Sequence, residues 1–210
     1  VNGRGYWVYL GPNPVTYEVT GPPNKFSQPA VVTYAVSGGS SEDGWNLVSN
    51  PYPSAIDWDA PTDATHWDKT NVDDAVYVYN SSTGSFASYV AGIGVNGGSR
   101  YIASQQAFWV KANAASPSVT VRELVKETSD PLGNPTYLKT MKNPNTSHYS
   151  MAFKDFPIPL NTNNTPNSIK FTANGNGFDD EMIILFKQGA TANFDSQYDA
   201  VKLTSSLNIS

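Results

Sequence analysis

The sequence feature that most constrains the fold is the Asn-Pro-Tyr-Pro corner at residues 50–53, which ends a short strand-like segment. In that segment Trp45, Leu47 and Val48 suit a pleated, half-buried surface. Each proline of the corner fixes its own φ, lacks an N–H and pushes the preceding residue out of the helical region. The backbone must therefore leave the sheet here in an extended or turning path. We expect Trp45 and Leu47 to face the core, because they alternate with Asn46 along the strand.

Short alternating segments, separated by turns rich in Gly, Pro, Asn and Ser, recur through the rest of the chain. No stretch shows sustained helical periodicity. This spacing predicts an all-β fold of two consecutive β-sandwich, jelly-roll-like units with long polar loops. Residues 60–71 are polar, and we expect them to be irregular. The expected strands lie at residues 4–10, 15–20, 31–36, 45–48, 75–79, 86–90, 102–112, 119–125, 147–153, 168–173 and 182–186.

The small, polar, proline-ended stretch at residues 112–117 is the best linker in the chain. A faint repeat supports a boundary there, because the Tyr-Trp-Val of residues 6–8 is echoed by the Phe-Trp-Val of residues 108–110. We predict one unit over residues 1–115, which holds the corner. A second unit, complete or lacking its later strands, is predicted over residues 116–210. The chain begins in mid-pattern without a signal peptide, so we expect it to be a piece of a longer precursor.

Composition narrows the classes of function. Charged residues make up only 15% of the 210 residues, against an average of about a quarter, and aromatic residues make up 12%. This profile is typical of a turn-rich extracellular β protein. The absence of cysteine excludes disulfides and thiolate metal sites. The net charge of −5 argues against nucleic acid as a partner, and no apolar run approaches the ~18 residues of a membrane span.

The sequence contains no convincing catalytic constellation. Its two histidines, His66 and His148, lie far apart in polar sequence, and there is no nucleophile elbow or zinc-hydrolase motif. Residues 92–97, Gly-Ile-Gly-Val-Asn-Gly, match the dinucleotide fingerprint, but loop and strand sequence follows instead of the required helix N-terminus. We therefore expect that the chain is not an enzyme.

An acidic loop offers a candidate metal site. Six aspartates lie within residues 57–74, and Asp57, Asp59 and Asp63 come first among them. Carboxylates on an irregular loop can converge on a hard cation, and a donor set of oxygens alone favours calcium. Aspartate is also favoured in loops simply because it forms Asx-turns. Calcium at Asp57, Asp59 and Asp63, or no cofactor and solvated turn residues, are the two interpretations.

Three aromatic residues near the corner, Tyr52, Trp58 and Trp67, lie in polar loop sequence where large rings are less expected. Exposed rings of this kind stack on sugar faces and mark interaction sites. The other interpretation is that they cover the open end of a sandwich. Their exposure separates the two.

Several segments resemble a β-sandwich module that occurs upstream of the C-terminal sorting domain in cargo of the type IX secretion system. Such cargo comprises large surface and secreted proteins of gliding Gram-negative bacteria. The resemblance covers roughly residues 44–112 and 168–203. It is carried by GWNLVSNPYPSAIDWD, NVDDAVYVYNSSTGSFASY, SRYIASQQAFWVKA and NGFDDEMIILFKQGATANFDSQYDAVKL. The resemblance implies a β-sandwich and an extracellular or outer-surface location, and it brings no catalytic residues.

These observations lead to two hypotheses of function. The first is a non-catalytic structural or adhesive domain, whose partners are the neighbouring domains of the same precursor. The alternative is a carbohydrate-binding module, in which Tyr52, Trp58 and Trp67 form a platform for an extracellular polysaccharide.

Overall fold

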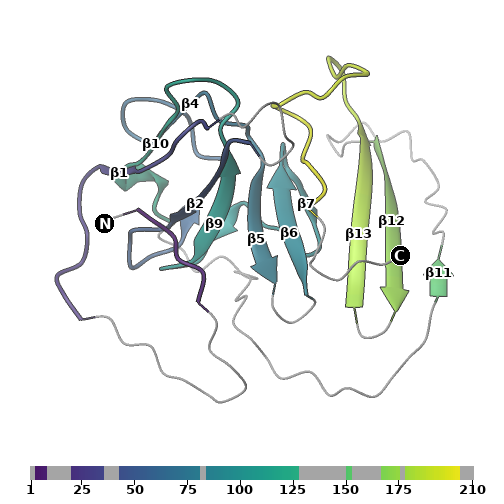
Figure 1. Ribbon diagram of the computed structural model, residues 1–210, viewed down its shortest axis with the longest axis horizontal. Helices are drawn as coiled ribbons and strands as arrows, with labels where there is room; N and C mark the ends of the chain where they lie inside the picture. The colour runs from purple at the N-terminus through teal and green to yellow at the C-terminus, as the bar shows by residue number, and fades with distance from the viewer. Residues whose placement is uncertain are drawn as a thin grey trace. The chain divides into compact units, whose positions relative to one another are not determined.

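The computed structural model describes residues 3–8, 20–35, 43–80, 84–127, 150–152, 167–175 and 178–203, and these residues are nearly all β, as predicted (Figure 1). The helical element in these ranges is η1 (Glu123–Val125), a single 3-10 turn. No helix in the same ranges has the length and apolar character needed to cross a bilayer. The chain divides into two units: unit 1 comprises Val1–Asp73 and Arg100–Pro135, and unit 2 comprises Asp74–Ser99 and Thr136–Ser210.

Unit 1 is built from short antiparallel strands. Its strands are β1 (Gln28–Ala30), β2 (Trp45–Ser49), β3 (Ile56–Asp57), β4 (Trp67–Thr70), β8 (Tyr101–Ile102), β9 (Ala107–Lys111) and β10 (Ser118–Val121). One sheet has the order β1-β10-β4, and β2 pairs with β9 and β3 with β8. Strand β2 ends at Ser49, immediately before the Asn-Pro-Tyr-Pro corner.

Three strands of unit 1, β1, β3 and β4, lie outside the strand ranges that were predicted. Strand β1 contains Pro29, which is tolerated because β1 is the edge of its sheet. Strand β4 lies in the polar stretch at residues 60–71, which was expected to be irregular; of its four residues Trp67 is buried. Conversely, residues 31–35 were predicted to be a strand and are not one.

The inward face of β2 is the opposite of the predicted one. Asn46 and Val48 are buried, whereas Trp45 and Leu47 are only half-buried. Burial of Asn46 is tolerated because its side-chain oxygen accepts a hydrogen bond from the Thr33 N–H (2.8 Å) and its amide nitrogen donates to the Thr33 carbonyl (2.8 Å). The buried apolar side chains of unit 1 are those of Val48, Tyr52, Ile56, Trp58, Trp67, Ile102, Phe108, Val110, Ala112, Val119, Val121 and Val125.

Unit 2 contains two three-membered sets of antiparallel strands. Strands β5 (Val76–Asn80), β6 (Ser85–Val90) and β7 (Ile93–Val95) follow one another in sequence and in space. Strands β11 (Ser150–Ala152), β12 (Asn167–Gly175) and β13 (Phe178–Phe186) form a sheet in that order. Of the fingerprint-like glycines, Gly92 lies in the turn before β7, Gly94 on β7 and Gly97 in the turn after it. An added Cβ at Gly98 would lie 1.9 Å from the Ser88 carbonyl oxygen, so no side chain fits there.

The predicted boundary between residues 115 and 116 falls between β9 and β10, both of which belong to unit 1. Strand β10 lies beyond that boundary and pairs with β1 and β4, which precede it. The predicted linker is also tied to the rest of unit 1. Ala112 is buried and donates its N–H to the Gly44 carbonyl (2.8 Å). Gly44 itself has a φ of +82°, and a Cβ at this position would lie 2.1 Å from the Ala112 oxygen.

Candidate functional site

The corner of unit 1 is fixed by a buried amide, that of Asn50. Its side-chain nitrogen lies within hydrogen-bond distance of the carbonyls of Ser54 (2.8 Å), Ile102 (3.1 Å) and Ala103 (2.9 Å). Its side-chain oxygen accepts a hydrogen bond from the Tyr52 N–H (2.9 Å). One side chain thus bonds backbone groups of the corner and of the segment that follows β8. An Asn before proline commonly begins a turn, but the buried hydrogen bonds of Asn50 were not predicted.

Tyr52 lies inside unit 1, with only 1% of its surface exposed. Its hydroxyl lies within donating distance of the Val121 carbonyl (3.0 Å) and the Phe26 carbonyl (2.5 Å), and the Lys126 ammonium lies 4.1 Å from the ring centroid. Burial, helped by the nearby charge of Glu123, raises the pKa of Tyr52 to about 12. The ring anchors the corner to β10 and is not available to a ligand.

Trp58 and Trp67 are also buried, and they pack against each other edge to face with ring centroids 5.0 Å apart. Trp58 makes a second edge-to-face contact with Phe108, at 5.8 Å. The Lys69 ammonium lies 4.3 Å from the Trp58 ring centroid, and Trp67 donates its indole N–H to the Asp57 carbonyl (2.7 Å). The three rings named as a sugar platform are therefore core residues, and they present no exposed face.

The carboxylates of the acidic loop bond to different partners. Arg100 holds Asp57 in a two-pronged ion pair, with Nε to Oδ1 at 2.8 Å and the second prong at 2.5 Å, and the same guanidinium lies 3.8 Å from Asp59. These hydrogen bonds raise the pKa of Arg100 above its ordinary value. The guanidinium of Arg100 thus lies next to both carboxylates and provides a positive charge that a calcium ion would otherwise provide.

Asp63 caps a tight turn instead of joining Asp57 and Asp59. Its Oδ1 accepts hydrogen bonds from the Thr65 N–H (2.7 Å), the Thr65 hydroxyl (2.8 Å) and the His66 N–H (2.9 Å). These donors, led by the Thr65 N–H and the His66 side chain, hold the pKa of Asp63 well below its usual value. Within the ranges that the structure describes, no three His, Cys, Asp or Glu side chains form a group able to hold a metal ion.

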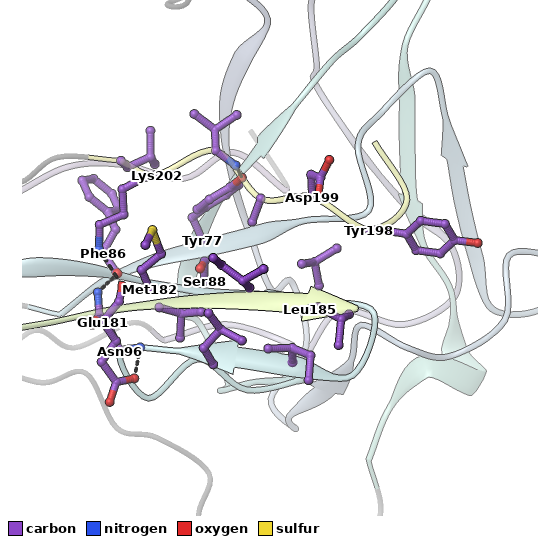
Figure 2. Close-up of a pocket in the computed structure, with 18 of the residues that line it drawn as sticks. Tyr77, Phe86, Ser88, Asn96, Glu181, Met182, Leu185, Tyr198, Asp199 and Lys202 are labelled. Atoms are coloured by element: carbon purple, nitrogen blue, oxygen red, sulfur yellow. Dashed lines mark hydrogen bonds between the residues drawn. The ribbon is translucent and has the colours of Figure 1, made fainter. Parts of the chain in front are cut away.

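Unit 2 contains a cavity that the sequence analysis did not anticipate. This cavity, which we call the slot, has a volume of about 360 Å³. It lies between β13 on one side and β6 and β7 on the other, and residues 198–203 form a third wall (Figure 2). Its apolar lining includes Phe86, Val90, Ile93, Val95, Met182, Ile183, Ile184, Leu185 and Leu203. Polar and charged side chains, among them Ser88, Asn96, Glu181, Lys187 and Asp199, also line it, so its surface is mixed.

A group of polar side chains bonded to one another lies at one end of the slot. Asn96 donates its N–H to the Glu181 carboxylate (2.8 Å) and its side-chain amide to Asp180 (2.9 Å). Asp180 also pairs with Lys202, and Lys170 pairs with the Glu181 carboxylate at 2.6 Å. Figure 2 shows Asn96, Glu181 and Lys202 together at this end, with Leu185 and Tyr198 toward the other. The charged side chains at this end already have partners within the protein.

The Tyr77 side chain ties the third wall to the sheet. Its hydroxyl accepts a hydrogen bond from the Val201 N–H (2.7 Å), and Figure 2 shows the ring between the strand and the segment above it. The sequence signal for the slot was the run Met182–Ile183–Ile184–Leu185–Phe186, which departs from simple alternation and gives β13 two apolar faces. The run alone could not predict the slot, because the opposite wall is formed by β6 and β7, which are distant in sequence.

A family model described as a domain of unknown function (DUF8693) matches residues 13–210. The chain belongs to this family. No curated protein and no solved structure matches the chain. The match includes the corner and every residue that lines the slot, so both regions lie within the family domain.

Proposed function

We propose that the chain is a non-catalytic structural module of a secreted or cell-surface protein, in which it spaces or presents neighbouring domains. The observation that supports this proposal is that the aromatic and acidic side chains of the corner contact other parts of unit 1. Tyr52, Trp58 and Trp67 are buried, and Asp57 is held by Arg100. Side chains that could have formed a binding surface instead stiffen the path of the chain through the corner.

The cellular setting is part of the same proposal. Residues 44–112 and 168–203 resemble modules of type IX secretion cargo, which act outside the cell or on its outer surface. The low content of charged residues, the many turn residues and the lack of cysteine are compatible with that setting. The partners in this proposal are the neighbouring domains of the same precursor.

A module exchange tests the spacing role. In the secreted protein that carries this chain, residues 1–210 are replaced either by an unrelated β-sandwich of similar length or by a flexible Gly/Ser linker. We expect the sandwich to restore surface display and activity of the neighbouring domains, because only rigidity and span are needed. The linker is expected to fail. If both replacements fail equally, the chain contributes a specific interaction and the spacing role is wrong.

A glycan array distinguishes the polysaccharide-binding alternative. The folded chain is screened with and without millimolar calcium, and its thermal unfolding is followed in the same two buffers. We expect no glycan signal that depends on Tyr52, Trp58 or Trp67, because these rings are buried. We also expect no calcium-dependent rise in melting temperature, since a cation bound only to the folded state would raise it. A glycan signal lost in the Trp58→Ala variant, with unit 1 still folded, would favour the carbohydrate-binding alternative.

A further inference from the structure

Strand β2 pairs with β9 along one edge, and its other edge is covered by residues 3–5. These residues, which we call the edge segment, run antiparallel to β2 within unit 1. Gly5 donates its N–H to the Leu47 carbonyl (3.0 Å), and Ser49 donates its N–H to the Gly3 carbonyl (3.1 Å). The edge segment therefore bonds to β2 as an added strand does.

The fit of the edge segment requires glycine. A Cβ added at Gly5 would lie 2.6 Å from the Leu47 Cγ and 2.7 Å from the Val48 carbonyl oxygen, both of which belong to β2. Gly3 has a φ of +74°, in the left-handed region that favours glycine. This edge of β2 thus accepts an extended segment that has glycine at two positions separated by one residue.

The edge segment is held mainly through its backbone. A further bond runs from the Ser49 hydroxyl to the Arg4 carbonyl (3.2 Å). The side chains that follow are largely exposed, at 64% for Tyr6, 60% for Trp7 and 50% for Val8. Segments with little buried apolar surface open at a low cost in free energy. A sheet edge that loses such a segment presents unpaired N–H and C=O groups to any other strand of the right shape.

We propose that this edge of β2 is an acceptor site for an extended Gly-x-Gly segment, and that its occupant from outside is residues 3–5 of a second copy of this chain. The second copy carries the same segment, so the bonds made within one chain can also be made between two. Main-chain hydrogen bonds to a sheet edge are a common way of binding a peptide strand. The site is separate from the spacing role proposed above, so either proposal can fail without the other.

A peptide titration tests the acceptor site. The full chain with Gly5→Val is labelled with ¹⁵N, because the added side chain keeps its own edge segment off an unchanged β2. A peptide with the sequence of residues 1–8 should shift the amide signals of Leu47, Val48 and Ser49, with half-saturation at about 1 mM. The matched control is the same peptide with Gly5→Val. It should leave these three signals unchanged up to about 5 mM.

A second titration tests the second copy as the occupant. The unlabelled donor is the full chain with Ser49→Pro, which lacks the N–H that bonds to Gly3 but keeps its own residues 3–5 unchanged. Proline is tolerated where the N–H points away from the neighbouring strand of the sheet. Added to the labelled Gly5→Val chain, this donor should shift the same three amides as the peptide does. Unlabelled Gly5→Val chain, which cannot donate the segment, should not.

Because a substituted chain could misfold, the unsubstituted chain provides an independent readout. Excess peptide should displace its edge segment, so the amide signals of Arg4 and Gly5 should move to the positions that they have in the free peptide. Three results overturn the acceptor site: no saturable shift at residues 47–49, equal binding of the two peptides, or shifts confined to residues outside β2 and the edge segment. A peptide that binds while the donor chain does not would overturn the second copy as the occupant.

Discussion

The corner of unit 1 and the slot of unit 2 use opposite residue types in opposite ways. The corner contains the aromatic and acidic side chains that sequence reasoning associates with ligands, yet these side chains bond to each other and to the backbone. The slot is bordered by aliphatic side chains of the kind that usually fill a core, together with polar and charged ones, yet about 360 Å³ of space beside them stays open. Residue type alone therefore does not locate a site. What matters is whether the contacts of a side chain are already made within the protein.

The largest expected effect lies in the filled region. Trp58→Ala removes two edge-to-face contacts and the ring beneath Lys69, and it should lower the free energy of unfolding by about 3–5 kcal/mol. Urea denaturation monitored by circular dichroism measures the change. Leu124→Ala, at an exposed position, is the control and should cost little. A loss for Trp58→Ala below about 1 kcal/mol would show that the ring is not part of a packed core.

The second prediction concerns the buried amide at the corner. Asn50→Ala leaves the Ile102 and Ala103 carbonyls without their side-chain donor, and it should destabilise the chain by about 1–3 kcal/mol. Asn24→Ala removes one partly buried hydrogen bond to the Pro51 carbonyl and should cost less. The free energy of unfolding in urea separates the two variants. Equal losses would mean that the corner is not organised around Asn50.

The third prediction uses alkaline pH. The pKa of Tyr52 is raised to about 12 in the folded chain, against about 10 when unfolded, because burial disfavours the ionised form. Stability from this group is present below pH 10 and is lost as the pH rises towards 12, because the unfolded chain releases the proton first. The difference in unfolding free energy between the unsubstituted chain and Tyr52→Phe should therefore fall over this range. A difference that is independent of pH would place the Tyr52 hydroxyl in water.

The smallest effect is expected at the slot. Ile183→Ala should lower the free energy of unfolding by about 1 kcal/mol, because its side chain is only half-buried and already borders open space. A cost as large as that of Trp58→Ala would mean that the slot is packed in solution, and the contrast between the two regions would disappear.

Several strands could be predicted because neighbouring residues in the sequence are enough to identify them. Alternation identified β2, β5, β6 and β9, and two prolines identified the end of β2 at Ser49. Strand β4 was not found, since its residues are polar except for Trp67 and its pairing depends on β10, far along the chain. The prediction of which β2 residues face the core was also wrong. The alternation of side chains along a strand does not show which of the two sets faces the core. Asn46 can be buried because its side-chain amide bonds to the backbone of Thr33.

The candidate site was less predictable because it depends on distant contacts. Tyr52, Trp58 and Trp67 were recognised as unusual in loop sequence, but their burial follows from β4, β9 and β10 closing around them. Asp57 was considered as a metal ligand without its partner, because Arg100 is separated from it by many residues. The slot requires β6 and β7 to face β13, and no local pattern encodes that arrangement.

The pairing of β1 with β10 also bears on how the chain acquires its structure. Gln28 lies opposite Val121, and between these residues the chain leaves unit 1 after Asp73 and returns at Arg100. Contacts this distant in sequence slow folding, because a long loop must close before they form. During synthesis from the N-terminus, β1 and β4 have no central strand until residue 121 has been made. A chain cut after residue 115 would lack β10, the central strand of the β1-β10-β4 sheet, and β1 and β4 would have no strand between them.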